Sequence, residues 1–194
     1  MAVTAEIDHF FDDPSEYHAP PRQYSNLYLL RRDIDFCLGI DRKTGGDTPC
    51  AALFLGTAGI LAGIDLLAKF KEGKDSAGMG EVGNRFRDYI AKHFPNVAPS
   101  DPHLLYKLRN SLIHSYGLYS KDKTNEYHFK LGWVSGAVVT SEPNDIYVVA
   151  VKTLYRDFEH SINDYRTKLI GDSALQKNFS MMFPHYGSIF YGPV

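Results

Sequence analysis

The sequence predicts a mainly α-helical protein, a bundle of four to five helices with a small β-hairpin inserted before the last long helix. Apolar residues recur at helical spacing in several stretches, which polar loops rich in glycine and proline separate. Residues 117–131 show two short strand-like segments around a polar turn. The 194 residues, 44% hydrophobic and 23% charged, suffice for one domain with its own core and are typical of a soluble globular chain.

The helical bundle is expected to span residues 23–170, after an irregular acidic arm over residues 1–22. The first sixteen residues carry five acidic side chains and neither lysine nor arginine, and Pro20 and Pro21 close the arm. From about residue 23 to residue 38, apolar residues repeat every three or four positions with charged residues between them. This pattern predicts an amphipathic helix.

The second helix of the bundle is predicted over about 49–70. Asp47 or Thr48 can cap it, and Pro49 then occupies a favoured first position. Glycine costs ~1 kcal/mol relative to alanine inside a helix, so several glycines on one side predict that a neighbouring helix comes close. Three lie three and four residues apart along this helix: Gly56, Gly59 and Gly63.

Two shorter helices and the hairpin come next along the chain. The pattern predicts a helix over about 81–93, ended by a proline, and another over about 102–116, capped by Ser100 or Asp101. The hairpin over about 117–131 turns at the polar segment KDKTNE.

The last long helix is predicted over about 145–170, because an apolar stripe at helical spacing continues through this whole stretch. Its first residues, IYVVAV, are β-branched and could form a strand instead. Residues 133–140 could add another strand. The tail of residues 171–194 contains seven aromatic or methionine side chains, so it is expected to dock on the body or on a second subunit.

Composition excludes several classes of protein. Cys37 and Cys50 are too few for a disulfide framework or a thiolate zinc site, and the eight histidines show no metal-ligand spacing, so neither metal nor cofactor is expected. The N-terminus lacks the basic and apolar regions of a signal peptide. The most apolar run, residues 51–64, is shorter than the ~20 residues that cross a bilayer. A cytoplasmic protein without a membrane partner is expected.

The charge distribution allows a local contact with nucleic acid. The net charge of −2 gives no general attraction to polyanions. Residues 92–130 nevertheless hold six basic side chains against three acidic ones. Within this patch, the candidate RNA-binding residues are His103, Lys107, Lys121 and Lys123.

The strongest functional signal is the sequence RNSLIHSY at residues 109–116, near the end of the predicted fourth helix. Asn110 and His114 lie one turn apart on the face opposite the leucine stripe of that helix. Arg109 lies at the border of the stripe, and its side chain is long enough to curl toward His114. A two-fold axis passing this face would bring both residues from two subunits into one cleft.

Such a cleft has the groups that RNA cleavage requires. Attack of a ribose 2′-hydroxyl on the adjacent phosphate needs a base, an acid and a cation beside the phosphate. Two copies of His114 could serve as base and acid, and the planar fork of Arg109 suits phosphate oxygens. In supporting roles, Asn110 could orient the ribose or the imidazole and Tyr116 could contact a phosphate or a base. Asp65 could hold the arginine.

The same run resembles the motif of the HEPN superfamily, R-x(4–6)-H on the penultimate helix of an all-α bundle. Arg109, His114 and Tyr116 also match the narrower R-x4-H-x-Y form of HEPN toxins that are encoded beside a minimal nucleotidyltransferase antitoxin. The resemblance is strongest over residues 50–116. It implies a homodimer that cleaves single-stranded RNA without a metal, using Arg109 and His114. It also implies a cognate antitoxin that attaches a nucleotide to Tyr116.

Two other interpretations of RNSLIHSY are open on the sequence alone. In a structural one, Arg109 pairs with Asp65, His114 interacts with the C-terminal end of the helix dipole, and Tyr116 is part of the core, with Gly117 as the left-handed stop. In the other, the protein keeps the HEPN fold and binds a nucleotide, an RNA or a protein without cleaving it.

Overall fold

A computed structural model describes residues 2–12, 23–42, 44, 46, 48–50, 52–75, 78 and 80–190. In this part of the chain, helices dominate: α1 (Ala2–Phe11), α2 (Asn26–Leu38), α3 (Leu53–Glu72), α4 (Glu81–His93), α5 (Asp101–Ser115), α6 (Val151–Gly171) and α7 (Ser173–Tyr186). The strands are short: β1 (Gln23–Ser25), β2 (Tyr119–Lys121), β3 (Glu126–Gly132), β4 (Val139–Glu142), β5 (Ile146–Ala150) and β6 (Ser188–Phe190). The prediction of a mainly α-helical protein is confirmed.

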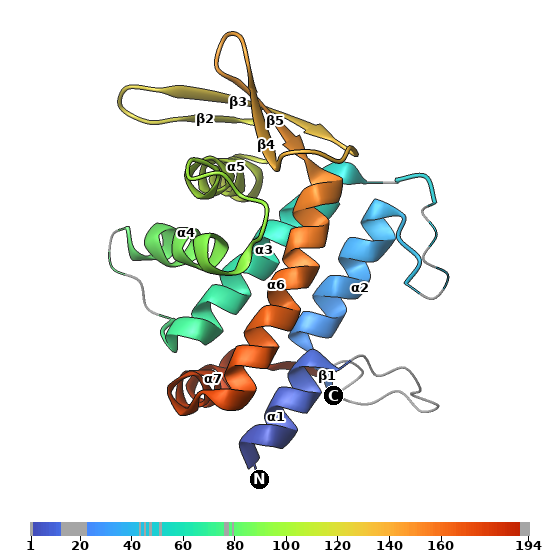
Figure 1. Cartoon of the computed structure of the whole chain (residues 1–194), viewed down its shortest axis with the longest axis vertical. Helices are drawn as coiled ribbons and strands as arrows, with labels where there is room; N and C mark the ends of the chain where they lie inside the picture. The colour runs from blue at the N-terminus through green and yellow to red at the C-terminus, as the bar shows by residue number, and fades with distance from the viewer. Residues whose placement is uncertain are drawn as a thin grey trace.

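Helix α3 is the centre of the fold, and α2, α4, α5, α6 and α7 all pack against it (Figure 1). Its glycines allow this packing. A Cβ atom added at Gly56 would lie 2.5 Å from Leu38 of α2, and one added at Gly63 would lie 2.5 Å from the Phe158 ring of α6. The close approach of neighbouring helices expected from the glycine spacing is therefore present on two sides of α3.

Helix α3 is also the one helix among the described residues that is long and apolar enough to cross a membrane. More than half of its most apolar segment, 56%, is buried inside the fold. Its fully buried residues include Ile60, Leu61, Ile64 and Leu67. Burial of this kind is typical of a helix in a hydrophobic core.

The prediction of an irregular arm over residues 1–22 is wrong for residues 2–11, which form α1. Ile7, Phe10 and Phe11 lie one helical turn apart and are buried in the core. Asp8 is exposed, Glu6 accepts a hydrogen bond from Ser180 of α7 at 3.1 Å, and Asp12, just after the helix, pairs with Arg166 of α6 at 2.8 Å. Packing of the apolar stripe therefore outweighs the acidic composition. Residues 13–22 of the predicted arm lie outside the described part.

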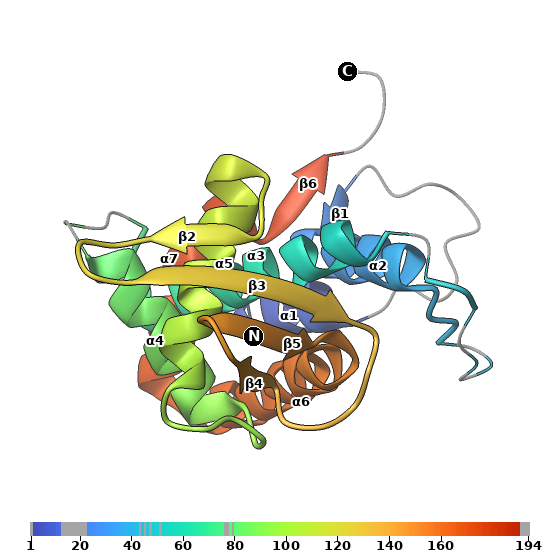
Figure 2. The same cartoon turned by 90° about the horizontal axis from the view of Figure 1, so that it is seen from above.

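A four-stranded sheet, in the order β2-β3-β5-β4, covers one end of the bundle (Figures 1 and 2). The β2–β3 hairpin is antiparallel and pairs Lys121 with Glu126, close to the predicted hairpin bounds of 117–131. Strand β5 runs parallel to β3 and antiparallel to β4. The predicted helix over 145–170 is thus wrong in its first turns, because residues 146–150 pair with strands on both sides. The helix begins at Val151.

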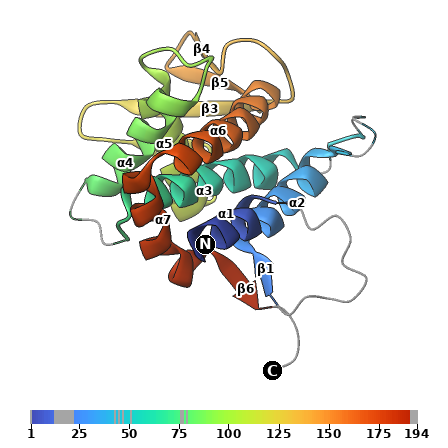
Figure 3. The same cartoon turned by 60° about the horizontal axis from the view of Figure 1, so that its bottom comes forward.

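The segment after α6 packs on the same chain. Phe179 of α7 is fully buried and contacts the rings of Phe10 and Phe70, with ring centroids 5.4 and 4.9 Å away. Strand β6 then pairs with β1, so the last described strand lies beside the strand that precedes α2 (Figure 3). Residues 191–194 lie outside the described part.

Candidate functional site

Arg109 of α5 and Asp65 of α3 form a partly buried ion pair. Arg109 donates from Nε to Asp65 Oδ2 at 2.6 Å, and its Nη2 lies 2.5 Å from the same oxygen. The two side chains are only 15% and 11% exposed. Helix α5 reaches this position because Leu105 and Leu108 anchor it in the core. A carboxylate at this depth needs a cation, and Arg109 supplies it.

Asp65 nevertheless keeps a raised pKa. Burial disfavours its charged form more strongly than Arg109, Arg85 and Lys69 favour it. Its second oxygen, Oδ1, has no hydrogen-bond partner among the described residues, and neither does the buried Nε of Arg85. Both side chains line a cavity of about 330 Å³ behind Arg109. Asp65 therefore holds Arg109 through one oxygen only.

The remaining nitrogen of the guanidinium, Nη1, lies 3.1 Å from Asn110 Oδ1 and 3.1 Å from His114 Nε2. Because a guanidinium only donates, His114 accepts this bond at Nε2, and its ring proton then resides on Nδ1. The arginine therefore links a buried carboxylate to an exposed histidine. Asn110 lies beside both groups and completes the cluster.

This cluster faces a cleft of about 610 Å³ between α5 and strand β2. Ser111 positions the strand: its hydroxyl bonds the carbonyl oxygens of Gly117 and Tyr119, both at 2.7 Å. Sequence reasoning missed this role of Ser111, whose burial depends on how the chain folds back after the helix. The groups around the cleft include Tyr106, Arg109, Asn110, His114, Tyr119 and Lys121.

Tyr116 ends α5 in an unusual conformation. It adopts the left-handed region, with φ 50°, and its backbone N–H bonds Ser111 O. Sequence reasoning placed the left-handed stop at Gly117 and allowed Tyr116 in the core, and both expectations are wrong. The side chain is 69% exposed, with its ring 4.9 Å from the Phe54 ring. For a non-glycine residue this conformation costs about 1–2 kcal/mol.

The four candidate RNA-binding residues lie near the β2–β3 hairpin, and most have protein partners. Lys107 pairs with Asp122 at 3.0 Å, and Lys121 pairs with Glu126 at 2.7 Å. His103 Nε2 lies 3.3 Å from the Tyr127 hydroxyl. Lys123 is exposed at the hairpin tip without an ion pair to any described residue, and it is the most available cation of the set.

The pKa of His103 is lowered, by partial burial and by the positive charges of Lys107 and Arg87. Its imidazole is therefore neutral at pH 7 and adds no positive charge to the basic patch. The described part of the chain contains no group of three or more histidine, cysteine, aspartate or glutamate side chains placed to bind a metal.

Two features near the site were not predicted from the sequence. Arg85 lies on the buried side of α4, where its helical phase with Phe86 and Tyr89 could have identified a charged residue facing inward. A second cavity lies at the N-terminal end of α5, where the hairpins meet the helix. No local pattern indicates it, because its walls come from segments that are distant in sequence.

Comparisons with protein-family models, with curated proteins and with solved structures find no match for this chain. A functional assignment therefore depends on the chemistry of the site itself.

Proposed function

We propose that this protein is a metal-independent endoribonuclease of the HEPN type that cleaves single-stranded RNA. The observation that carries the proposal is the contact of Arg109 with the exposed His114 at the cleft, with Asp65 anchoring the arginine from behind. A histidine and an arginine at one solvent-facing site are the groups that phosphodiester cleavage by an internal hydroxyl requires.

In the proposed reaction, the bound RNA displaces the contact between Arg109 and His114, and the freed Nε2 of one neutral His114 takes the proton from the ribose 2′-hydroxyl. The 2′-oxygen then attacks the adjacent phosphorus, and the bond from phosphorus to the 5′-oxygen of the next nucleotide breaks. A second His114 donates a proton to that leaving oxygen. Arg109 stabilises the negative charge on the phosphate oxygens. The products are a 2′,3′-cyclic phosphate and a free 5′-hydroxyl, and this sequence of steps needs no metal.

The second histidine comes from a second copy of the chain in this proposal. One chain places one His114 at the cleft, so the base and the acid require two. Exposed apolar side chains flank the motif, and association would cover them: Leu55 at 48%, Ile113 at 42% and Tyr116 at 69% exposure. A two-fold interface places the same patch on both subunits, as this arrangement needs.

The strained, exposed Tyr116 supports a toxin–antitoxin setting. Backbone strain in a bulky residue often accompanies function, and here Gly117 stands next in the chain and would accept the left-handed conformation at no cost. The exposed Tyr116 hydroxyl would be accessible to a nucleotidyltransferase antitoxin. Modification there would place a charged group at the rim of the proposed dimer interface.

A second candidate function is an RNA- or nucleotide-binding module that does not cleave. The observation that favours it is that every guanidinium nitrogen of Arg109 already has a protein partner, in Asp65, Asn110 or His114. A phosphate would have to displace one of these contacts. Arg109 would then act mainly by shaping the cleft.

Cleavage of a mixed-sequence single-stranded RNA in EDTA separates the two functions. The ribonuclease proposal predicts 2′,3′-cyclic phosphate ends and a loss of about 10²–10⁴-fold in rate for His114→Ala. His160→Ala, which removes an exposed histidine of α6, is the matched control and should cleave at the wild-type rate. RNA binding without cleavage by the wild-type protein would favour the binding module. Equal cleavage by His114→Ala would refute the assignment of the site.

A further inference from the structure

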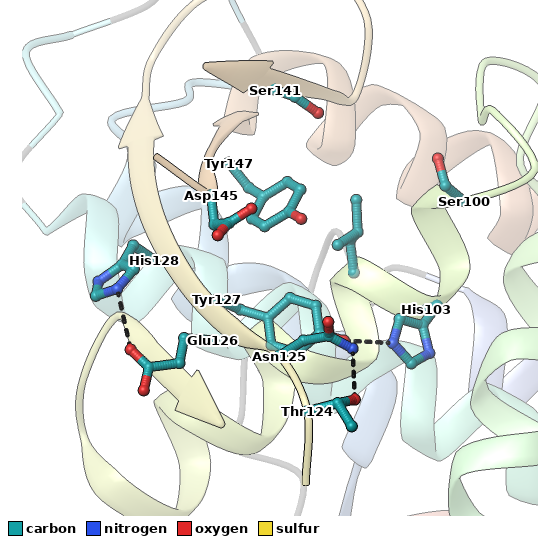
Figure 4. A pocket seen from close by; sticks show the side chains of 11 residues that line it. Ser100, His103, Thr124, Asn125, Glu126, Tyr127, His128, Ser141, Asp145 and Tyr147 are labelled. Atoms are coloured by element: carbon teal, nitrogen blue, oxygen red, sulfur yellow. Dashed lines mark hydrogen bonds and ion pairs between the residues drawn. The ribbon is translucent and has the colours of Figure 1, made fainter. Parts of the chain in front are cut away.

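A second cavity, of about 670 Å³, lies at the N-terminal end of α5 (Figure 4). Its volume is in the range of pockets that bind small ligands. The walls come from α5, from the β2–β3 hairpin and from the β4–β5 hairpin. The lining side chains include His103, Asn125, Tyr127, Asp145 and Tyr147.

Hydrogen bonds hold one wall of this cavity in place. The Tyr127 hydroxyl donates to Asp122 Oδ2 at 3.0 Å and accepts from His103 Nε2 at 3.3 Å. The backbone N–H groups of Thr124 and Asn125 also bond Asp122, and together with Lys107 they hold its pKa far below the usual range. Asp122 therefore stays ionised, and the Tyr127 ring is a fixed aromatic surface.

The opposite wall contains a free carboxylate. Asp145 lies in the β4–β5 turn with φ 55°, and its carboxylate has no hydrogen-bond or ion-pair partner among the described residues. Figure 4 shows this carboxylate beside the Tyr147 ring, which points into the cavity. The Tyr127 and Tyr147 rings lie 5.9 Å apart with 33° between their planes. An aromatic surface and a free acceptor thus stand next to each other.

The charge of the cavity decides which part of a ligand fits. Its lining carries Glu126 and Asp145 and no lysine or arginine. A phosphate group would be repelled here. A planar, neutral ligand that donates hydrogen bonds fits better, because a carboxylate only accepts them. Unpaired nucleobases stack on aromatic side chains and are identified through hydrogen bonds on their edges.

We propose that this cavity binds an unpaired guanine base. Guanine presents two adjacent donors, N1–H and N2–H, which one carboxylate can accept together, whereas adenine, cytosine and uracil present no such pair. Asp145 is the acceptor in this arrangement, and the Tyr147 ring packs on the base. Asn125, whose amide donates to Thr124 with one of its two hydrogens, has a second N–H for the O6 or N7 atom of guanine.

The position of the cavity relates it to the proposed cleavage site, and to that extent the inference rests on the proposed function. His103 and His114 are eleven residues apart on α5, or about 16 Å along the helix axis. Lys121 lines the cleft and Thr124 lines the cavity, so the hairpin tip with Lys123 lies between them. An extended RNA crossing this tip would place a base in the cavity a few nucleotides from the scissile phosphate.

Nucleotide binding tests the proposal without depending on cleavage. Full-length protein carrying His114→Ala is titrated with GMP, AMP, CMP and UMP by calorimetry, and with fluorescent octamers of uridine with and without one guanosine by anisotropy. We expect guanine to bind at least about tenfold more tightly than the other bases in one or both arms. Asp145→Asn should abolish the preference, and it preserves the turn because asparagine also adopts positive φ. Asp33→Asn, an exposed carboxylate change on α2, is the matched control.

A second variant separates stacking from edge recognition. Tyr147→Leu keeps an apolar side chain but removes the ring, and it should weaken the binding of every base to a similar degree. If the ligand is guanine within RNA, the octamer binds more tightly than GMP and its affinity falls with salt. If it is the free nucleotide, GMP binds as tightly as the octamer.

The outcomes distinguish this inference from the ribonuclease proposal. Guanine preference, together with a wild-type protein that cleaves no RNA, would leave the base site standing and refute the ribonuclease. Cleavage without guanine preference in either arm would refute the base site alone. A preference that survives Asp145→Asn would also overturn the inference, because the carboxylate would then not be the acceptor.

Discussion

Replacing Arg109 with methionine would leave the Asp65 carboxylate buried without its cation. Removal of one partner from a buried ion pair costs about 3–5 kcal/mol, and the partial exposure of both side chains, 15% and 11%, places this pair at the lower end. We therefore expect Arg109→Met to lower the free energy of unfolding by ~3 kcal/mol at pH 7.5. For a domain of this size, the loss corresponds to roughly 6–12 °C in Tm.

The pH dependence of this loss identifies its cause. Burial already raises the folded-state pKa of Asp65, and loss of the arginine raises it further. A carboxyl group with a raised folded-state pKa destabilises the protein at pH values above that pKa, and the penalty disappears as pH falls and the group is protonated. The destabilisation by Arg109→Met should therefore be smaller at pH 4.5 than at pH 7.5.

Urea unfolding followed by circular dichroism at both pH values measures these quantities. The double variant Asp65→Asn with Arg109→Met should recover part of the lost stability, because no buried charge remains. Arg32→Met breaks an exposed pair with Asp33 and should change the free energy of unfolding by less than about 0.5 kcal/mol. A loss below 1 kcal/mol for Arg109→Met, or a loss that is equal at both pH values, would refute the reasoning.

Three further predictions concern the fold. Gly63→Ala should destabilise the protein by about 1–3 kcal/mol despite the better helix propensity of alanine, because the new Cβ meets Phe158. The Cβ of the control variant Gly171→Ala meets no atom within 4 Å, so this variant should be neutral or stabilising in the same thermal melt. Phe179→Ala should cost about 3–5 kcal/mol in urea unfolding if α7 is part of the core, and a cost below 1 kcal/mol would contradict that. Burial lowers the folded-state pKa of His93, so the contribution of this residue to stability is present above pH ~6.5 and is lost as pH falls. His93→Gln should therefore reduce the change in the free energy of unfolding between pH 7.5 and pH 5. An unchanged dependence of that free energy on pH would exclude this role.

The helices with strong local patterns were predictable from the sequence. Residues 81–93 and 102–116 were expected as helices, and α4 and α5 span Glu81–His93 and Asp101–Ser115. Apolar periodicity acts within one or two turns, so a local pattern suffices to locate such helices. The glycines of α3 also predicted close packing, because the free-energy cost of glycine inside a helix has to be offset by contact with a neighbouring helix.

Other elements depended on partners that are distant in sequence. The stretch Ile146–Ala150 has a pattern that suits both helix and strand, and β3 and β4 on either side of it decide for the strand. Helix α1 looked like an acidic arm because its buried face exists only once Phe179 and Phe70 are in place. Hydrogen bonds between strands and burial between helices are long-range, so local composition does not report them.

Some features of the candidate site were likewise predictable from the sequence, and others depended on the fold. The motif RNSLIHSY was identifiable before the fold was known, and so was the reach of Arg109 toward His114, because the two residues are five positions apart on one helix and the arginine side chain is long enough to span them. Asp65 was predictable as the partner of Arg109 because a carboxylate in an apolar helix requires a cation. Three features are visible only in the folded chain: Tyr116 rather than Gly117 takes the left-handed position, Lys107 pairs with Asp122, and a second cavity is present. These depend on where the chain returns after α5, and that path follows from the packing of the whole sheet on the bundle.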